Sequence, residues 1–196
     1  MPQPRPLDLA DDATAAAVHR IGLAAYAVEA ELIGFDGIPA LGEGLEEMRA
    51  RPLRWLGAVT EAGAVAGFLA WEETRDGVSV DRLCVDPAWF RRGVASLLLR
   101  HALAELFPGR RVEVTTGAAN TPAVSLYERL GFTRGPDFTP VPGLRMASFS
   151  TLAGSRWGTG RRAGTSQGRP KYGGPRGNEE SCAVPQSRSS VSPPRC

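Results

Sequence analysis

Cysteine and histidine are scarce in this chain, which has three cysteines and two histidines among 196 residues. Cys84 lies in an apolar run, whereas Cys182 and Cys196 lie near the C-terminus, so the chain lacks both a disulfide framework and a metal-ligand spacing. His19 and His101 fall on expected helices, and neither has a partner at a spacing that supports a catalytic triad. We therefore expect no metal site.

Long apolar runs are absent as well. No stretch approaches the roughly 20 residues that a membrane-spanning helix needs. The first six residues, Met-Pro-Gln-Pro-Arg-Pro, lack the apolar core of a secretory signal peptide. The sequence therefore predicts a cytoplasmic protein without a membrane partner.

The composition changes at about residue 153. From Gly154 to Cys196 the chain is rich in Gly, Arg, Ser and Pro and has few large apolar residues. Such a segment cannot bury enough apolar surface to offset its ordering entropy. We therefore expect a folded domain over residues 1–152 and a disordered basic tail over residues 153–196.

Charge is divided unevenly between these two parts. The last 43 residues carry eight basic and two acidic side chains, a net charge of +6 against +2 for the whole chain, so the first 153 residues carry −4. A basic tail could contact nucleic acid through phosphates. A solvated extension without a partner is the favoured interpretation, and a run-on or frame-altered C-terminus is a third alternative that the sequence leaves open.

Apolar periodicity and turn residues predict alternating helices and strands. Asp11 or Asp12 is the expected N-cap of the first helix, and Thr121, followed by Pro122, the expected cap of the last. The order predicts an α/β fold with a mixed central sheet covered by helices. Helices are expected at about 12–33, 45–53, 93–107 and 121–131, and extended segments at about 7–9, 55–60, 65–72, 78–85, 111–115, 132–138 and 144–149.

The most informative stretch is Leu83–Ser96, in which an apolar strand leads through a turn into a helix. The turn carries Arg91, Arg92 and the small residue Gly93. A helix start presents unpaired backbone N–H groups and the positive end of the helix dipole, which suits a phosphate anion.

A second stretch, Ala119–Phe132, places Asn120 just before a helix and Tyr127 within it, and closes on Gly-Phe. In this order and spacing the two stretches resemble the core motifs of the GNAT family of acyl-CoA-dependent N-acetyltransferases. The resemblance covers about residues 4–150. It implies a GNAT fold with a mostly antiparallel sheet, and direct transfer of an acetyl group from acetyl-CoA to a primary amine of a small molecule or a protein.

The resemblance also implies where acetyl-CoA binds. The family's phosphate pattern, Gln/Arg-x-x-Gly-x-Gly/Ala, is met here by Phe90-Arg91-Arg92-Gly93-Val94-Ala95, with Phe90 as a departure at its first position. In the family two neighbouring strands splay apart, and the cofactor's pantetheine arm lies in the gap between them. The implied cofactor-binding residues are Leu83, Cys84 and Val85 through their backbone, Arg91, Arg92, Gly93, Val94, Ala95 and Ser96 around the phosphates, and Asn120 and Tyr127.

For catalysis the resemblance implies Tyr127 as the general acid that protonates the departing thiolate. Many relatives carry a glutamate base where this chain has Ser79, so Asp81, two residues on, is the candidate base. Glu72 and Glu73, a base acting through water, and no dedicated base remain alternatives. Cys84 could act as a nucleophile by forming an acyl-cysteine, but the favoured interpretation is a small apolar residue in the strand.

The acceptor is expected between residues 26–45 and 137–146, where Glu29, Glu31, Asp36 and Glu43 give the first segment an acidic character suited to an amine. A homodimer is a further partner that the sequence leaves open. The competing hypothesis is a catalytically silent acetyl-CoA sensor.

Overall fold

The computed structural model describes residues 1–153, which form eight strands, four α-helices and shorter helical turns. The expectations for residues 154–196 lie outside this range. In chain order the elements are β1 (Gln3–Pro6), α1 (Asp12–Ile33), η1 (Pro39–Leu41), α2 (Leu45–Ala50), β2 (Arg54–Val59), β3 (Val65–Thr74), β4 (Gly77–Val85), η2 (Pro87–Trp89), α3 (Val94–His101), η3 (Ala102–Leu106), β5 (Arg111–Gly117), α4 (Thr121–Arg129), β6 (Thr133–Arg134), β7 (Phe138–Val141) and β8 (Leu144–Leu152).

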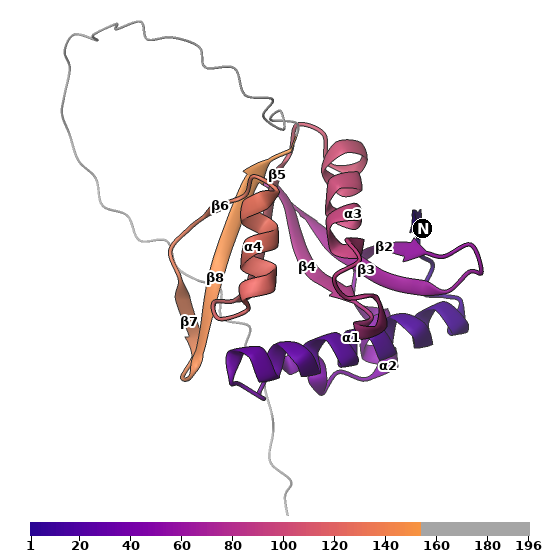
Figure 1. Cartoon of the computed structure of the whole chain (residues 1–196), viewed down its shortest axis with the longest axis horizontal. Helices are drawn as coiled ribbons and strands as arrows, with labels where there is room; N and C mark the ends of the chain where they lie inside the picture. Colours follow the sequence, from indigo (N-terminus) through magenta and orange to yellow (C-terminus); the bar gives the residue numbers. More distant parts are fainter. Residues whose placement is uncertain (154–196) are drawn as a thin grey trace, which may run out of the picture. The chain divides into compact units, whose positions relative to one another are not determined.

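The strands form one sheet in the order β1-β2-β3-β4-β5-β8-β6, with β7 paired to β8 (Figure 1). Neighbouring strands are antiparallel except β4 and β5, which run parallel. The expected fold class, a mixed and mostly antiparallel sheet flanked by helices, is confirmed.

Helices cover both faces of the sheet. On one face, Leu98 of α3 and Leu126 of α4 join a core with Val112 and Phe149. On the other face, Val18 and Ile21 of α1 and Met48 of α2 pack with Trp55 and Phe68. Within residues 1–153 no helix combines the length and apolar character needed to cross a membrane.

Two helix boundaries follow from capping side chains. Asp11 caps α1 by accepting a hydrogen bond from the Thr14 N–H at 2.8 Å, as expected. The cap of α4 is Asn120, which accepts from the Ala123 N–H, so the expectation that Thr121 is the cap is wrong and Thr121 is the first helical residue.

The end of α4 agrees with the sequence. Gly131 has a φ of 77° and donates to the Glu128 carbonyl, while the Phe132 N–H donates to the Tyr127 carbonyl. These two bonds make a Schellman motif, and the Tyr127 and Phe132 rings supply the apolar contact that accompanies it. Gly-Phe therefore ends the helix and packs against Tyr127.

Three elements differ from expectation. The segment expected as one strand at about 132–138 forms two, β6 and β7, which pair separately with β8. The first strand is Gln3–Pro6, not the segment 7–9, and it pairs only with β2 at the edge of the sheet. An edge strand tolerates Pro4 and Pro6 because one side of it needs no ladder hydrogen bond. The helix expected to run to residue 107 is α-helical only to His101 and continues as a π-helical turn, Ala102–Leu106.

Candidate active site

A cleft opens where β4 and β5 part. The two strands pair only from Val78 with Val112 to Val80 with Val114, and both continue beyond this point without pairing to each other. The cleft has a volume of about 1190 Å³. It brings together all but one of the residues predicted for the site: Asp81, Leu83, Cys84, Val85, Arg91, Gly93, Val94, Ala95, Ser96, Asn120 and Tyr127 line it.

Arg92 is the exception. It does not line the cleft, and its guanidinium stands over the Trp89 ring, 5.2 Å from the ring centre.

The splay of β4 from β5, which the family resemblance implies, is confirmed, because the two strands pair only over Val78–Val80 of β4.

A β-bulge at Asp81 changes the face of the sheet on which the following side chains of β4 lie. Val80 pairs with Trp71 and Arg82 pairs with Ala70, so Asp81 is the extra residue. Val80 packs into the core under α3 and α4, whereas Cys84 packs into the core under α1. Without the bulge these two side chains, four residues apart, would lie on one face.

The backbone of β4 presents hydrogen-bonding groups to the cleft. The Asp86 N–H donates to the Ala66 carbonyl on β3. Because backbone groups of an antiparallel strand alternate in direction, the N–H and C=O groups of Cys84 also face β3, and those of Leu83 and Val85 face the side where β5 has moved away. Leu83 and Val85 therefore leave free donors and acceptors along the cleft.

The turn before α3 is built around two left-handed residues, Arg91 with φ 63° and Gly93 with φ 78°. No side chain caps the N-terminus of α3, so the N–H groups of its first turn remain available. A Cβ placed on Gly93 would meet no protein atom within 4 Å, which shows that open space lies beside these donors. The arrangement fits an anion such as a pyrophosphate.

Tyr127 lies on α4, 4% exposed, with its ring against Phe132 and Phe149. Its hydroxyl makes no hydrogen bond to any described residue, yet no buried side-chain oxygen in residues 1–153 is left without a partner. The hydroxyl must therefore reach the cleft that the residue lines. Burial raises the pKa of Tyr127 well above its ordinary value, and nearby Glu29 raises it further, so the hydroxyl stays protonated.

Asp81, the predicted base, is held by two arginines. Its Oδ1 accepts from Arg51 at 2.7 Å and its Oδ2 from Arg82 at 2.9 Å. Arg82, whose side chain is 4% exposed, also donates to both oxygens of Glu43. Both oxygens of Asp81 are thus engaged in ion pairs.

Cys84 is 3% exposed, and burial raises the pKa of its thiol to about 12. A thiol so far from ionisation is a poor nucleophile. Its location in the core agrees with the interpretation as a small apolar residue.

Glu29 was noted in the sequence only for its charge. Its Oε1 accepts three hydrogen bonds, from Thr116 Oγ1 at 3.0 Å, the Gly117 N–H at 3.2 Å and Asn120 Nδ2 at 3.1 Å. These donors lie 87 to 91 residues away in the sequence, so no local pattern could have identified them. The Asn120 side chain is thereby engaged at both ends, as the cap of α4 and as a donor to Glu29.

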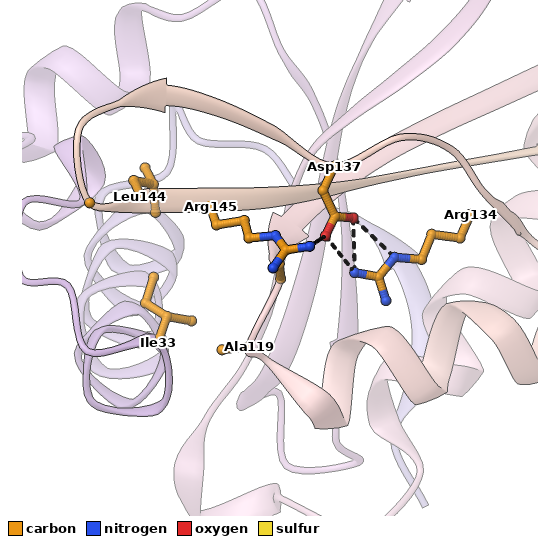
Figure 2. Close-up of a pocket in the computed structure, with 8 residues that line it drawn as sticks. Ile33, Ala119, Arg134, Asp137, Leu144 and Arg145 are labelled. Carbon is orange, nitrogen blue, oxygen red and sulfur yellow. Dashed lines mark hydrogen bonds and ion pairs between the residues drawn. The ribbon is translucent and has the colours of Figure 1, made fainter.

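A second, smaller hollow of about 240 Å³ lies beside Ile33 at the end of α1, within the region expected for the acceptor (Figure 2). Asp137 accepts from Arg134 at 2.9 Å and from Arg145 at 2.9 Å. These contacts hold the pKa of Asp137 below its ordinary value, with the hydrogen bond from Arg134 as the largest cause. None of the predicted site residues lines this hollow.

Comparison with known proteins identifies the family. A model of the acetyltransferase (GNAT) family matches residues 16–132. UPF0157 protein YqkA from Bacillus subtilis (strain 168) is 35% identical over 129 residues, which are 66% of this chain and 37% of YqkA, so the chain spans little more than a third of that relative.

Solved structures share the fold. The ribosomal-protein-S18-alanine N-acetyltransferase from Escherichia coli matches with a TM-score of 0.60 at 20% identity, over 83% of this chain and 100% of that one. The PaiA N-acetyltransferase from Thermoplasma acidophilum, in complex with coenzyme A, matches with a TM-score of 0.58 at 13% identity, over 76% of this chain and 98% of that one. With the family model covering more than half of its residues, the chain belongs to the acetyltransferase (GNAT) family.

Proposed function

We propose that this protein is an N-acetyltransferase that moves an acetyl group from acetyl-CoA directly to a primary amine. The observation that carries the proposal is the convergence on one cleft of three features: the open first turn of α3, the free backbone of Leu83 and Val85, and the hydroxyl of Tyr127. Each meets a different requirement of acyl transfer.

Each part of the donor substrate would have a contact in this cleft. The pyrophosphate would bind the N–H groups at the start of α3, with Arg91 as a charged neighbour. The pantetheine arm would pair with Leu83 and Val85 like an added strand, while the Cys84 backbone remains in the β3 ladder. Asn120 keeps one Nδ2 hydrogen for a cofactor contact beyond its bond to Glu29.

The chemistry follows from this placement. The neutral amine attacks the thioester carbonyl, and backbone N–H groups of β4 stabilise the oxyanion that forms. The carbon–sulfur bond then breaks, and Tyr127 donates its proton to the departing thiolate. Asp81 as the base would first have to give up an ion pair with Arg51 or Arg82.

The acceptor class remains a small-molecule amine or a protein amine. The Escherichia coli neighbour is named for an alanine of a ribosomal protein, which makes a protein N-terminus one amine to test. Amines of both kinds therefore belong in the acceptor panel.

The test is calorimetric titration of the full chain with acetyl-CoA, CoA and NADH, followed by turnover of an amine panel. Saturable binding of acetyl-CoA and CoA but not NADH, with acetylation of at least one amine, is the expected result. Binding without turnover of any amine would favour the acetyl-CoA sensor. If the folded protein bound neither acetyl-CoA nor CoA, both the N-acetyltransferase and the acetyl-CoA sensor hypotheses would be excluded.

We expect Gly93→Ala to weaken CoA binding about tenfold or more, because a side chain at this left-handed residue disturbs the donors of α3 and intrudes beside the phosphates. Gly109→Ala is the matched control, since Gly109 has a φ of 72°, no protein atom near a built Cβ, and no place in the cleft. Both variants should lose similar stability in thermal unfolding. An equal loss of CoA affinity in both would contradict the assignment.

A further inference from the structure

The two acidic residues that line the cleft differ in how their charge is balanced. Asp81 is paired with Arg51 and Arg82. Glu29 forms no ion pair with any described residue, and its three hydrogen-bond donors, a hydroxyl, a backbone amide and a side-chain amide, are all neutral. Glu29 therefore brings an uncompensated negative charge to the cleft.

One oxygen of Glu29 is held and the other is free. All three hydrogen bonds end on Oε1, and no described residue donates to Oε2. Because Glu29 is only partly exposed and residues 1–153 contain no buried side-chain oxygen without a partner, Oε2 must be in contact with solvent. Since the residue lines the cleft, that oxygen is open to it.

The hydrogen bonds through Oε1 also fix where this charge lies relative to Tyr127. Asn120 donates to Glu29 and, through its Oδ1, caps the helix that carries Tyr127. Thr116 and Gly117 form the end of β5, on the far side of the cleft from the free backbone of β4. The carboxylate is therefore anchored between α1, β5 and α4, the elements around the predicted reaction centre.

We infer that Glu29 binds the acceptor: its free Oε2 accepts a hydrogen bond from the acceptor's ammonium and is the first group to take the proton that the amine must lose. The inference deepens the proposed function and rests on it for the reaction itself. It assigns the base to α1 instead of β4, and it favours acceptors that enter the cleft as ammonium ions.

The step balances as follows. The ammonium gives one proton to Oε2, and the nitrogen lone pair forms the new bond to the thioester carbon. On collapse the carbon–sulfur bond breaks, the sulfur takes the proton of Tyr127, and the nitrogen's second proton returns to Tyr127 through water. The products are an amide, the CoA thiol and one proton, which Glu29 releases to solvent.

A purely structural role for Glu29 is the competing explanation, since it joins α1 to the loop before α4. The variant Glu29→Gln distinguishes the structural role from acceptor binding. Its side-chain oxygen can still accept from Thr116, Gly117 and Asn120, while the charge is lost. The matched control is Glu47→Gln, the same change at an exposed position of α2 that lies outside the segment expected to bind the acceptor. Melting temperatures of both variants establish that they fold.

The binding measurement is an NMR titration of the CoA-loaded full chain with n-butylammonium chloride and, separately, with n-butanol, a neutral analogue of similar shape. Wild type and Glu47→Gln should bind the ammonium about tenfold more tightly than the alcohol, and Glu29→Gln should lose this preference. A wild type without the preference, or a Glu29→Gln variant that keeps it, would overturn the inference.

Kinetics with the best amine of the panel give the second readout. Glu29→Gln should lower kcat/KM for the amine about 10- to 100-fold and leave the KM for acetyl-CoA unchanged. Unchanged kcat/KM would overturn the inference and leave the proposed function intact. Conversely, a wild type that acetylates no amine but shows the Glu29-dependent ammonium preference would overturn the proposed function and leave the binding role of Glu29 standing.

Discussion

Tyr127→Phe is expected to lower kcat about 100- to 1,000-fold while leaving the affinity for acetyl-CoA within about twofold. The hydroxyl has no hydrogen-bond partner among the described residues, so its removal strands no buried donor or acceptor. The ring keeps its contacts with Phe132 and Phe149, and the melting temperature should hardly change. If Tyr127 is the proton donor, its variant should lose rate while binding and stability stay intact. If Tyr127 only packs in the core, the rate should not fall in this way.

Tyr26→Phe is the matched control, because Tyr26 lines the same cleft and undergoes the same change. Single-turnover rates and calorimetric affinities for both variants decide the assignment. Were Tyr26→Phe to lose the rate and Tyr127→Phe to keep it, the general acid would be Tyr26 and the assignment drawn from the family motif would be wrong.

The sequence predicted those parts of the fold that depend on local signals. Helix α1 begins after the expected cap Asp11 and ends at the expected Ile33, because a capping carboxylate and Gly34, in the left-handed conformation, are encoded beside the boundaries. The Gly-Phe end of α4 was predictable for the same reason. The edge strand β1 was not predictable from the sequence. It contains Pro4 and Pro6, and proline is depleted from strands in general, so the segment did not look like a strand.

The site was predictable where a motif of contiguous residues forms it and not where tertiary contacts do. The loop before α3 and Tyr127 follow from two short motifs, and both lie in the cleft. Asp81 binds Arg51, which lies 30 positions away in the sequence, and Glu29 binds Asn120, which lies 91 positions away. Neither contact could be predicted from a local pattern. The bulge that turns Arg82 toward Glu43 has no sequence signal of its own, since period two is the only rule that a strand pattern offers.

Replacement of the buried Arg82 is expected to cause the largest loss of stability. Arg82→Met should lower the free energy of unfolding by about 3 kcal/mol, because Glu43 and Asp81 would lose the buried guanidinium and keep only that of the 40%-exposed Arg51. Arg20→Met is the control, since Arg20 pairs with Asp86 but is 62% exposed, and its loss should cost about 1 kcal/mol or less. Denaturant unfolding of the three proteins at neutral pH gives the comparison, and equal losses would contradict the role of burial.

The same network makes the difference between wild type and Arg82→Met depend on pH. The hydrogen bond from Arg82 is the largest cause that lowers the pKa of Glu43 below its ordinary value of 4.5, while burial opposes it. A carboxyl whose pKa is lower in the folded state stabilises the fold fully above its unfolded pKa, and the stabilisation is lost as the pH falls through the folded value. The gap between the two unfolding free energies should therefore be constant near neutral pH and shrink as the pH drops below about 4.5. A gap that stays constant into the acid range would mean that Arg82 stabilises the fold through its packing and not through its ion pair with Glu43.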